Sequence, residues 1–157
     1  MKVQVITVNN RPPDWAQQAC DDYSRRMPAD WQLQFKNVKP ADRQDGKKSA
    51  QYMTTEAQRI LTAIKGNSGC LVALDERGKA LTTHGLRHLI EQENNDKGAI
   101  TFIIGGADGL APEIKSACHH LVQLSALTLP HAMAKVLLVE QIYRAAAIAS
   151  NHPYHRD

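Results

Sequence analysis

The feature that most limits the fold of this chain is a regular alternation between strand-like runs and helical patterns. The strand-like runs are short and rich in β-branched residues, and helical periodicity separates almost all of them. Such alternation favours an α/β fold with a mostly parallel sheet flanked by helices. The predicted strands are Val3–Val8, Gln32–Val38, Cys70–Asp75, Ile100–Ile104 and Leu121–Leu127.

Start and stop signals place the helices between these strands. Pro12-Pro13-Asp14 opens the first helix and Gly66 ends the second. Thr82-Thr83 can cap the third helix, and Pro112 lies near the first turn of the fourth, where proline is well tolerated. These boundaries leave each helix between two predicted strands.

The last predicted helix, about residues 132–150, is apolar around almost its whole circumference. A helix of this kind needs burial on two sides. Two interpretations stay open: the helix lies in a subunit interface, or it is one deeply buried helix of the core. Its apolar residues are Val136, Leu137, Ile142, Tyr143, Ala146, Ala147 and Ala149.

Length and composition predict one soluble domain over residues 1–157, which is long enough to bury a full hydrophobic core. The N-terminus lacks the apolar segment of a signal peptide, and the longest uncharged stretch, residues 116–134, is too polar for a membrane span. Cys20, Cys70 and Cys118 are odd in number and form no CxxC pair. We therefore expect buried thiols and a cytoplasmic protein.

Positive charge is concentrated in one segment. The whole chain has a net charge of +3, whereas the segment Arg25–Lys48 contains seven basic and three acidic residues, an excess of +4. Such a segment attracts phosphates, but a solvated loop between charged strands explains it equally well. Within it, residues 39–48 are predicted to form a long surface loop.

Three predicted strand ends carry loops that can form a ligand pocket. The fourth strand runs into Gly105-Gly106-Ala107-Asp108-Gly109, where glycines let backbone amides approach a ligand closely. The fifth breaks into residues 124–131, and the third ends at Leu74-Asp75. Ligands of open α/β sheets bind outside the carboxyl ends of strands, so we expect these three ends to line one pocket. By itself, the glycine cluster fits a tight structural turn equally well.

The histidines give only weak metal signals. His84 and His88 lie one helical turn apart, but Gly85 stands where a metalloprotease needs glutamate. His152 and His155 form a short His-x-x-His run in the tail. His119-His120 is interpreted as a helix end, where imidazoles satisfy the last carbonyls. We expect no metal.

Four motifs occur in order in the C-terminal third: Ile-Gly-Gly-x-Asp-Gly (104–109), Leu-Ser-x-Leu-Thr-Leu-Pro-His (124–131), Glu-Gln-Ile-Tyr-Arg-Ala (140–145) and His-Pro-Tyr-His (152–155). With them, the chain resembles the ribosomal RNA large subunit methyltransferase H family, in the SPOUT class of knotted methyltransferases. The resemblance covers essentially the full length, including Asp14-Trp15 and Tyr23-x-Arg25-Arg26.

This resemblance implies transfer of a methyl group from S-adenosylmethionine to N3 of pseudouridine 1915 in helix 69 of 23S ribosomal RNA, on the assembled ribosome. It also implies a C-terminal trefoil knot, an exception to the usual unknotted topology, and a homodimer. Carried over by motif, the cofactor contacts fall on Leu74, Gly105, Gly106, Leu124, Ser125, Ala126, Leu127, Thr128 and Leu129.

The hypothesis for catalysis places His155 and Tyr154 at the target base, reaching the cofactor of a partner subunit. Arg144 would anchor a phosphate or polarise the uracil carbonyls, and Glu140, one turn earlier, would orient that arginine or form a helix ion pair only. Lys135 stands where the family usually has arginine, which keeps the charge but loses bidentate geometry.

Two other functions compete with this interpretation. A non-catalytic ribosome-binding factor would use the basic segment Arg25–Lys48 and bind no cofactor. Another knotted methyltransferase would act on transfer RNA with the same fold and cofactor. The short chain lacks room for an appended RNA-binding domain, which favours a substrate already shaped by the ribosome.

Overall fold

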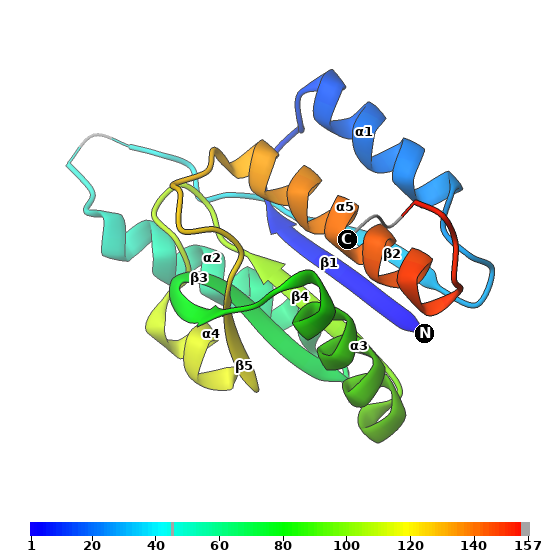
Figure 1. Cartoon of the computed structure of the whole chain (residues 1–157). Coiled ribbons are helices and arrows are strands. Elements are labelled where there is room, and N and C mark those ends of the chain that lie inside the picture. The colour runs from blue at the N-terminus through cyan, green and yellow to red at the C-terminus, as the bar shows by residue number, and fades with distance from the viewer. Residues whose placement is uncertain (45, 155–157) are drawn as a thin grey trace.

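The computed structural model describes residues 1–44 and 46–154, and in them five parallel strands form one sheet in the order β2-β1-β4-β3-β5 (Figure 1). The inner strands are buried on both faces, as expected for parallel strands covered by helices. The strands are β1 (Lys2–Val8), β2 (Gln32–Val38), β3 (Cys70–Ala80), β4 (Ile100–Ile104) and β5 (His120–Gln123). The predicted α/β architecture is confirmed. The trefoil knot stays a prediction.

Helices cover both faces of the sheet. On one face α3 (Thr83–Lys97) and α5 (His131–Ala149) pack on a core centred on Phe102, and α1 (Asp14–Arg25) packs on the outer side of α5 (Figure 1). On the other face α2 (Ser49–Ile64) and α4 (Pro112–Ala117) pack on a second core around Ile103.

The predicted boundary signals act as expected. Pro13 and Thr82 are the N-cap residues of α1 and α3, and the Thr82 hydroxyl accepts a hydrogen bond from the Gly85 amide at 3.1 Å. Pro112 is the first residue of α4. Gly66 follows the end of α2 with φ of +80°, a conformation that glycine adopts without strain.

Two strands end at positions that the sequence did not predict. β5 ends at Gln123 rather than Leu127, because the Ser125 hydroxyl accepts a hydrogen bond from the Leu127 amide at 2.9 Å and turns the chain. β3 continues to Ala80, because Val122 of β5 pairs with Leu74 and, after an irregularity in β3, also with Lys79. Local composition does not reveal this second pairing.

The apolar circumference of α5 is explained within the chain. The helix lies between α1 and α3 and above the sheet, and Leu138, Ile142 and Ala145 are fully buried. Of the two interpretations left open, the deeply buried core helix is therefore the one that the structure supports. A subunit interface at α5 is not tested by a single chain and stays a prediction.

The interpretation of His119-His120 as a helix end is wrong. Helix α4 ends at Ala117, and His120 begins β5. His119 Nδ1 accepts a hydrogen bond from the Leu71 amide at 3.0 Å, and His120 Nε2 lies 2.8 Å from Glu93 Oε1. The imidazoles thus join neighbouring elements instead of capping a helix.

The thiols agree with the sequence prediction. In the described residues all three cysteines are free, with Cys20 and Cys70 buried and Cys118 half-buried. Burial raises the pKa of Cys70 to about 12 and that of Cys118 to about 11, so both are protonated at neutral pH. Within the part of the chain that the structure describes, no helix is long and apolar enough to cross a membrane.

Glu93 makes the stability of the fold depend on pH in the acid range. The Lys97 ammonium donates to Glu93 Oε2 at 2.8 Å and, together with His120, outweighs burial and lowers the pKa of Glu93 to about 2 from 4.5. Because the folded-state pKa is depressed, the carboxylate stabilises the fold above about pH 4.5 and loses this contribution as the pH falls toward about 2.

We expect the free energy of unfolding of Glu93→Gln to be lower than that of the native chain at neutral pH. As the pH falls from about 6 to about 2, this difference should shrink by about 3 kcal/mol. Urea unfolding at a series of pH values measures it. Glu113→Gln, at an exposed position on α4, is the matched control and should parallel the native pH profile. A native-like profile for Glu93→Gln would contradict the assignment.

Candidate active site

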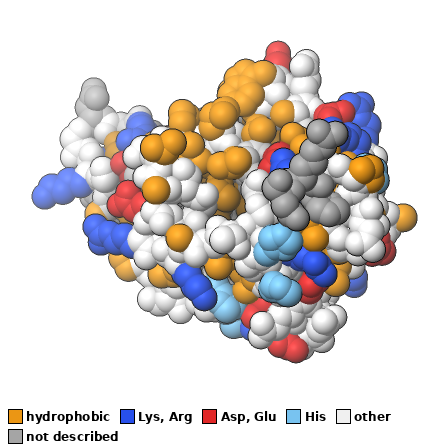
Figure 2. All heavy atoms as spheres, viewed as in Figure 1, with side chains coloured by type: hydrophobic (Ala, Val, Ile, Leu, Met, Phe, Trp, Pro, Cys, Tyr) orange, Lys and Arg blue, Asp and Glu red, His pale blue; other side chains and the backbone are white. Residues whose placement is uncertain are grey.

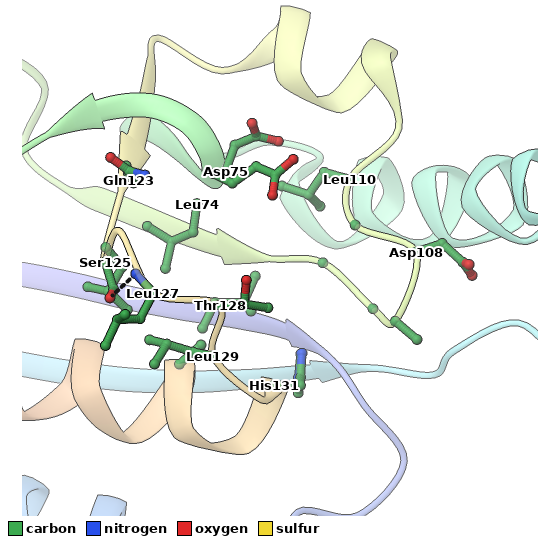
Figure 3. A pocket seen from close by; sticks show the side chains of 18 of the residues that line it. Leu74, Asp75, Asp108, Leu110, Gln123, Ser125, Leu127, Thr128, Leu129 and His131 are labelled. Atoms are coloured by element: carbon green, nitrogen blue, oxygen red, sulfur yellow. Dashed lines mark hydrogen bonds between the residues drawn. The ribbon is translucent and has the colours of Figure 1, made fainter.

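A pocket of about 510 Å³ opens where β4 and β5 end, beside Leu74 and Asp75 in the middle of β3 (Figure 3). Leu74 and Asp75 come from β3, residues 104–110 follow β4, and residues 123–129 follow β5. Its size is that of a site for a small organic ligand. The prediction that these three segments line one pocket is confirmed, although β3 does not end at Asp75 but continues to Ala80.

At Gly105 and Gly106 the glycine loop packs too closely against neighbouring atoms to accommodate a side chain. A Cβ at Gly105 would lie 2.7 Å from the Gly109 carbonyl carbon, closer than real atoms approach. Gly109 has φ of +84°, and its amide donates to the Gly106 carbonyl at 3.0 Å, which closes the turn. A Cβ at Gly106 would lie 2.8 Å from Glu56 Oε2. The loop therefore presents backbone to the pocket.

All nine residues that the sequence proposed for the cofactor line this pocket. Leu74 and Leu129 supply apolar wall, and the Leu124–Leu129 loop curves around the cavity opposite the glycine loop (Figure 3). The Ser125–Leu127 hydrogen bond fixes the turn that gives this loop its shape. Leu127 is 76% exposed, so its side chain is available to whatever covers the pocket.

Two ion pairs in the pocket were not predicted. Lys115 of α4 pairs with Asp75, and Arg43 of the predicted surface loop pairs with Asp108 of the glycine loop. Burial raises the pKa of Asp75, but the bonds from Lys115 and the Arg77 amide outweigh it and keep that pKa low. No local pattern marks Lys115, because only the packing of α4 brings it to the strand end.

His131, the first residue of α5, is a further pocket residue. Burial lowers the pKa of its imidazole, which is therefore neutral at pH 7. Its Nε2 is buried and has no hydrogen-bond partner among the described residues. A buried polar atom without a partner is costly in a folded chain.

The proposed catalytic side chains form a separate cluster on α5. Arg144 donates from Nε and Nη2 to Glu140 Oε1 at 2.9 and 2.6 Å, so the predicted pairing of these two residues is confirmed. The Tyr154 hydroxyl donates to the same oxygen at 3.3 Å, and the Arg144 guanidinium lies 5.0 Å from the Tyr154 ring centroid. His155 lies outside the described residues.

Aromatic and cationic side chains from α1 and α5 hold Tyr154 in place. Its ring meets Tyr143 edge to face with centroids 4.7 Å apart, and its hydroxyl lies 3.4 Å from that of Tyr23. Arg26 lies 4.7 to 5.5 Å from the three tyrosine ring centroids. Burial, with Tyr23 and Glu140 beside it, raises the pKa of Tyr154. The phenol is therefore a hydrogen-bond donor at neutral pH.

The structure does not bring the two groups together within one chain. Neither Arg144 nor Tyr154 is among the residues that line the pocket. Tyr154 contacts Glu140, which lies six residues after the pocket residue Ala134, or about 9 Å along the helix. The role of Tyr23 and Arg26 in holding the tail was also missed, although both lie in a segment that carries the family resemblance.

Comparison with known proteins shows which family has this arrangement. The family model described as "Predicted SPOUT methyltransferase" matches residues 1–155. The chain belongs to this family. Proteins named ribosomal RNA large subunit methyltransferase H are 49% identical in Bordetella avium and 43% identical in Paraburkholderia phymatum, each over 99% of both chains. The resemblance seen in the sequence is confirmed.

Solved structures support the SPOUT fold. A probable methylase family protein from Haemophilus influenzae superposes with a TM-score of 0.60 at 15% identity, covering 99% of this chain and 70% of the other. A probable methyltransferase from Bordetella pertussis superposes with a TM-score of 0.56 at 13% identity, covering 92% and 96%. At these identities the likeness concerns the fold alone.

In this SPOUT methyltransferase, Lys135 is no surface cation. It is 3% exposed, with its ammonium 4.9 Å from the Phe35 ring centroid, and burial lowers its pKa. A buried ammonium on an aromatic face cannot clamp a phosphate at the surface. Lys135 therefore contributes to packing under α5.

Proposed function

We propose that this protein transfers a methyl group from S-adenosylmethionine to N3 of a pseudouridine in helix 69 of 23S ribosomal RNA, within the assembled ribosome. The observation that carries the proposal is the pocket, which all nine expected cofactor residues line. The full-length likeness to proteins named ribosomal RNA large subunit methyltransferase H supports the substrate.

The residues of the pocket fit this cofactor. Gly105 and Gly106 leave backbone amides open to the adenine edge, while Leu74 and Leu129 cover apolar surface. Asp75 and Asp108 put carboxylates in the same lining, but each is already paired with a cation, Lys115 or Arg43, so the fit to the cofactor rests on the backbone and the apolar walls. When bound, S-adenosylmethionine supplies a methyl group that its positive sulfur has already activated.

The protein's own task is to position the target base and remove its N3 proton. Histidine titrates near neutral pH, so His155 is our candidate for the base. Tyr154, which stays protonated, donates a hydrogen bond, and Arg144 binds a phosphate or polarises a uracil carbonyl. Glu140 positions both side chains through one carboxylate oxygen.

A homodimer would unite tail and pocket. Tyr154 lies against α5 of its own chain and does not line its own pocket, so a second copy would bring its tail to that pocket. Trp15, Leu127 and Met133 are large hydrophobic residues that are 44 to 76% exposed. Figure 2 shows hydrophobic side chains gathered over the beginnings of α1 and α5. Exposed apolar surface of this kind marks association sites.

Methyl transfer from labelled S-adenosylmethionine tests the proposal. The native protein is incubated with unmethylated 70S particles, free 50S subunits or bulk transfer RNA, and the product nucleoside is identified by mass spectrometry. We expect 3-methylpseudouridine on 70S particles. Transfer to transfer RNA instead would support the second knotted methyltransferase, and absence of cofactor binding would support the non-catalytic ribosome-binding factor.

Arg144→Lys tests the two hydrogen bonds of the guanidinium. The variant keeps the positive charge but cannot present Nε and Nη2 together to Glu140. We expect kcat to fall by about 10- to 100-fold, the value of one charge-assisted hydrogen bond, with the affinity for S-adenosylmethionine unchanged. Arg87→Lys, which changes a similar pair with Glu91 on α3, is the control and should keep native kcat.

A further inference from the structure

A second group of reactive side chains lies at the amino edge of the sheet, opposite the pocket. Cys70 is the first residue of β3, His120 is the first residue of β5, and Glu93 comes from α3. Cys70 Sγ, a Glu93 carboxylate oxygen and His120 Nε2 all lie within 4.8 Å of one another. Neither the methyl transfer chemistry nor the pocket uses these residues.

The cluster is dry on one side and open on the other. Cys70 is fully buried and Glu93 is 5% exposed, whereas the His120 side chain is 38% exposed. Glu93 divides its two oxygens: Oε1 faces His120 Nε2 at 2.8 Å, and Oε2 accepts from Lys97 Nζ at 2.8 Å. One oxygen is thus held by an ammonium while the other faces the imidazole.

We propose that Cys70, Glu93 and His120 bind a zinc ion. Thiolate, imidazole and carboxylate are the ligand types that Zn²⁺ takes, and water can reach a fourth position past the exposed edge of His120. Lys97 stays on Oε2 and orients the carboxylate, as outer partners of metal ligands do. On binding, the Cys70 S–H bond gives way to an S–Zn bond and the proton leaves to solvent.

The geometry requires only small movements. With bonds of about 2.0 Å to nitrogen and oxygen and about 2.3 Å to sulfur, ligand atoms in a tetrahedral zinc site lie roughly 3.3 to 3.6 Å apart. The Glu93–His120 pair, now at 2.8 Å, must therefore open, and the widest pair, within 4.8 Å, must close. A bound ion would tie β3, α3 and β5 together at this edge.

Metal binding is measured on the untagged, full-length chain after removal of metal. Zn²⁺ is titrated in competition with a chromophoric chelator, and Co²⁺ is added separately as a spectroscopic probe. We expect one equivalent of Zn²⁺, a thiolate-to-cobalt charge-transfer band, and a Tm that rises with free Zn²⁺. A native chain that binds neither ion would overturn the proposal, leaving a closed hydrogen-bonded network.

Matched variants locate the ion. Loss of a residue that only orients a metal ligand lowers metal affinity by roughly 10- to 100-fold. Cys70→Ser and His120→Ala remove a ligand itself, so each should lower the affinity for Zn²⁺ by more than that. Cys20→Ser, at another buried cysteine, and His88→Ala, at an exposed histidine of α3, should bind like the native chain. If Cys70→Ser does not fold, the test rests on His120→Ala, because the His120 side chain is half-exposed. A native affinity of His120→Ala for Zn²⁺ would refute the site. None of these measurements depends on methyl transfer.

Discussion

A chain that lacks residues 152–157 is expected to lose methyl transfer by about 10²- to 10⁴-fold, the contribution of general acid–base catalysis, while binding S-adenosylmethionine like the native protein. No residue after Ala134 lines the pocket among the described residues, so removing residues 152–157 leaves the described pocket lining intact. Single-turnover transfer to 70S particles and calorimetric titration of the cofactor measure the two effects separately.

Truncation also removes the Tyr154 ring from Tyr143, so a gentler variant is needed as control. Tyr154→Phe keeps the ring contacts with Tyr143 and loses only the hydroxyl that contacts Tyr23 and Glu140. Tyr154→Phe should fold like the native chain, and its rate of methyl transfer should fall between that of the native and that of the truncated chain. If the truncated chain methylated at the native rate, the assignment of Tyr154 and His155 to the target base would be wrong.

Gly105→Ala is expected to weaken binding of S-adenosylmethionine by about 10- to 100-fold, because relieving an overpacked atom costs about 1 to 3 kcal/mol. The new Cβ would lie 2.7 Å from the Gly109 carbonyl carbon and 2.9 Å from the Leu110 nitrogen. Backbone atoms cannot rotate away as a flexible side chain can, so the glycine loop must shift. Calorimetric titration of the cofactor measures the loss.

Gly85→Ala is the matched control for this substitution. Gly85 lies in the first turn of α3, and a Cβ there would meet its nearest atom, Thr82 Oγ1, at 3.4 Å. Alanine favours a helix over glycine, so this variant should bind the cofactor like the native chain. Equal affinities of Gly105→Ala and the native chain would contradict the placement of the cofactor against this loop.

The two defects together test whether the tail acts on a partner. In a mixed dimer made by co-expression, the truncated chain supplies an intact pocket and the Gly105→Ala chain supplies an intact tail. If the tail reaches across the dimer, the mixture has higher methyl transfer activity than either parent. Action of each tail on its own pocket predicts no recovery, because no chain in the mixture carries both parts.

The sequence determined the α/β fold and the lining of the pocket. Hydrophobic periodicity and boundary residues such as Pro13 and Thr82 are local signals, and they placed the helices close to their observed positions. The carboxyl ends of parallel strands share one edge of the sheet. Once the strands were placed, the meeting of Leu74, the glycine loop and the Leu124–Leu129 loop followed.

Only the tertiary structure decided which distant side chains meet. It brought Lys115 to Asp75 in the pocket, buried Lys135 against Phe35, and placed Tyr23 of α1 beside Tyr154 of the tail. Such contacts depend on how helices cross the sheet and each other, and residues that meet this way leave no regular spacing along the chain. Local propensity and periodicity report only a residue's own element and the face it occupies, so they determine the elements but not these contacts.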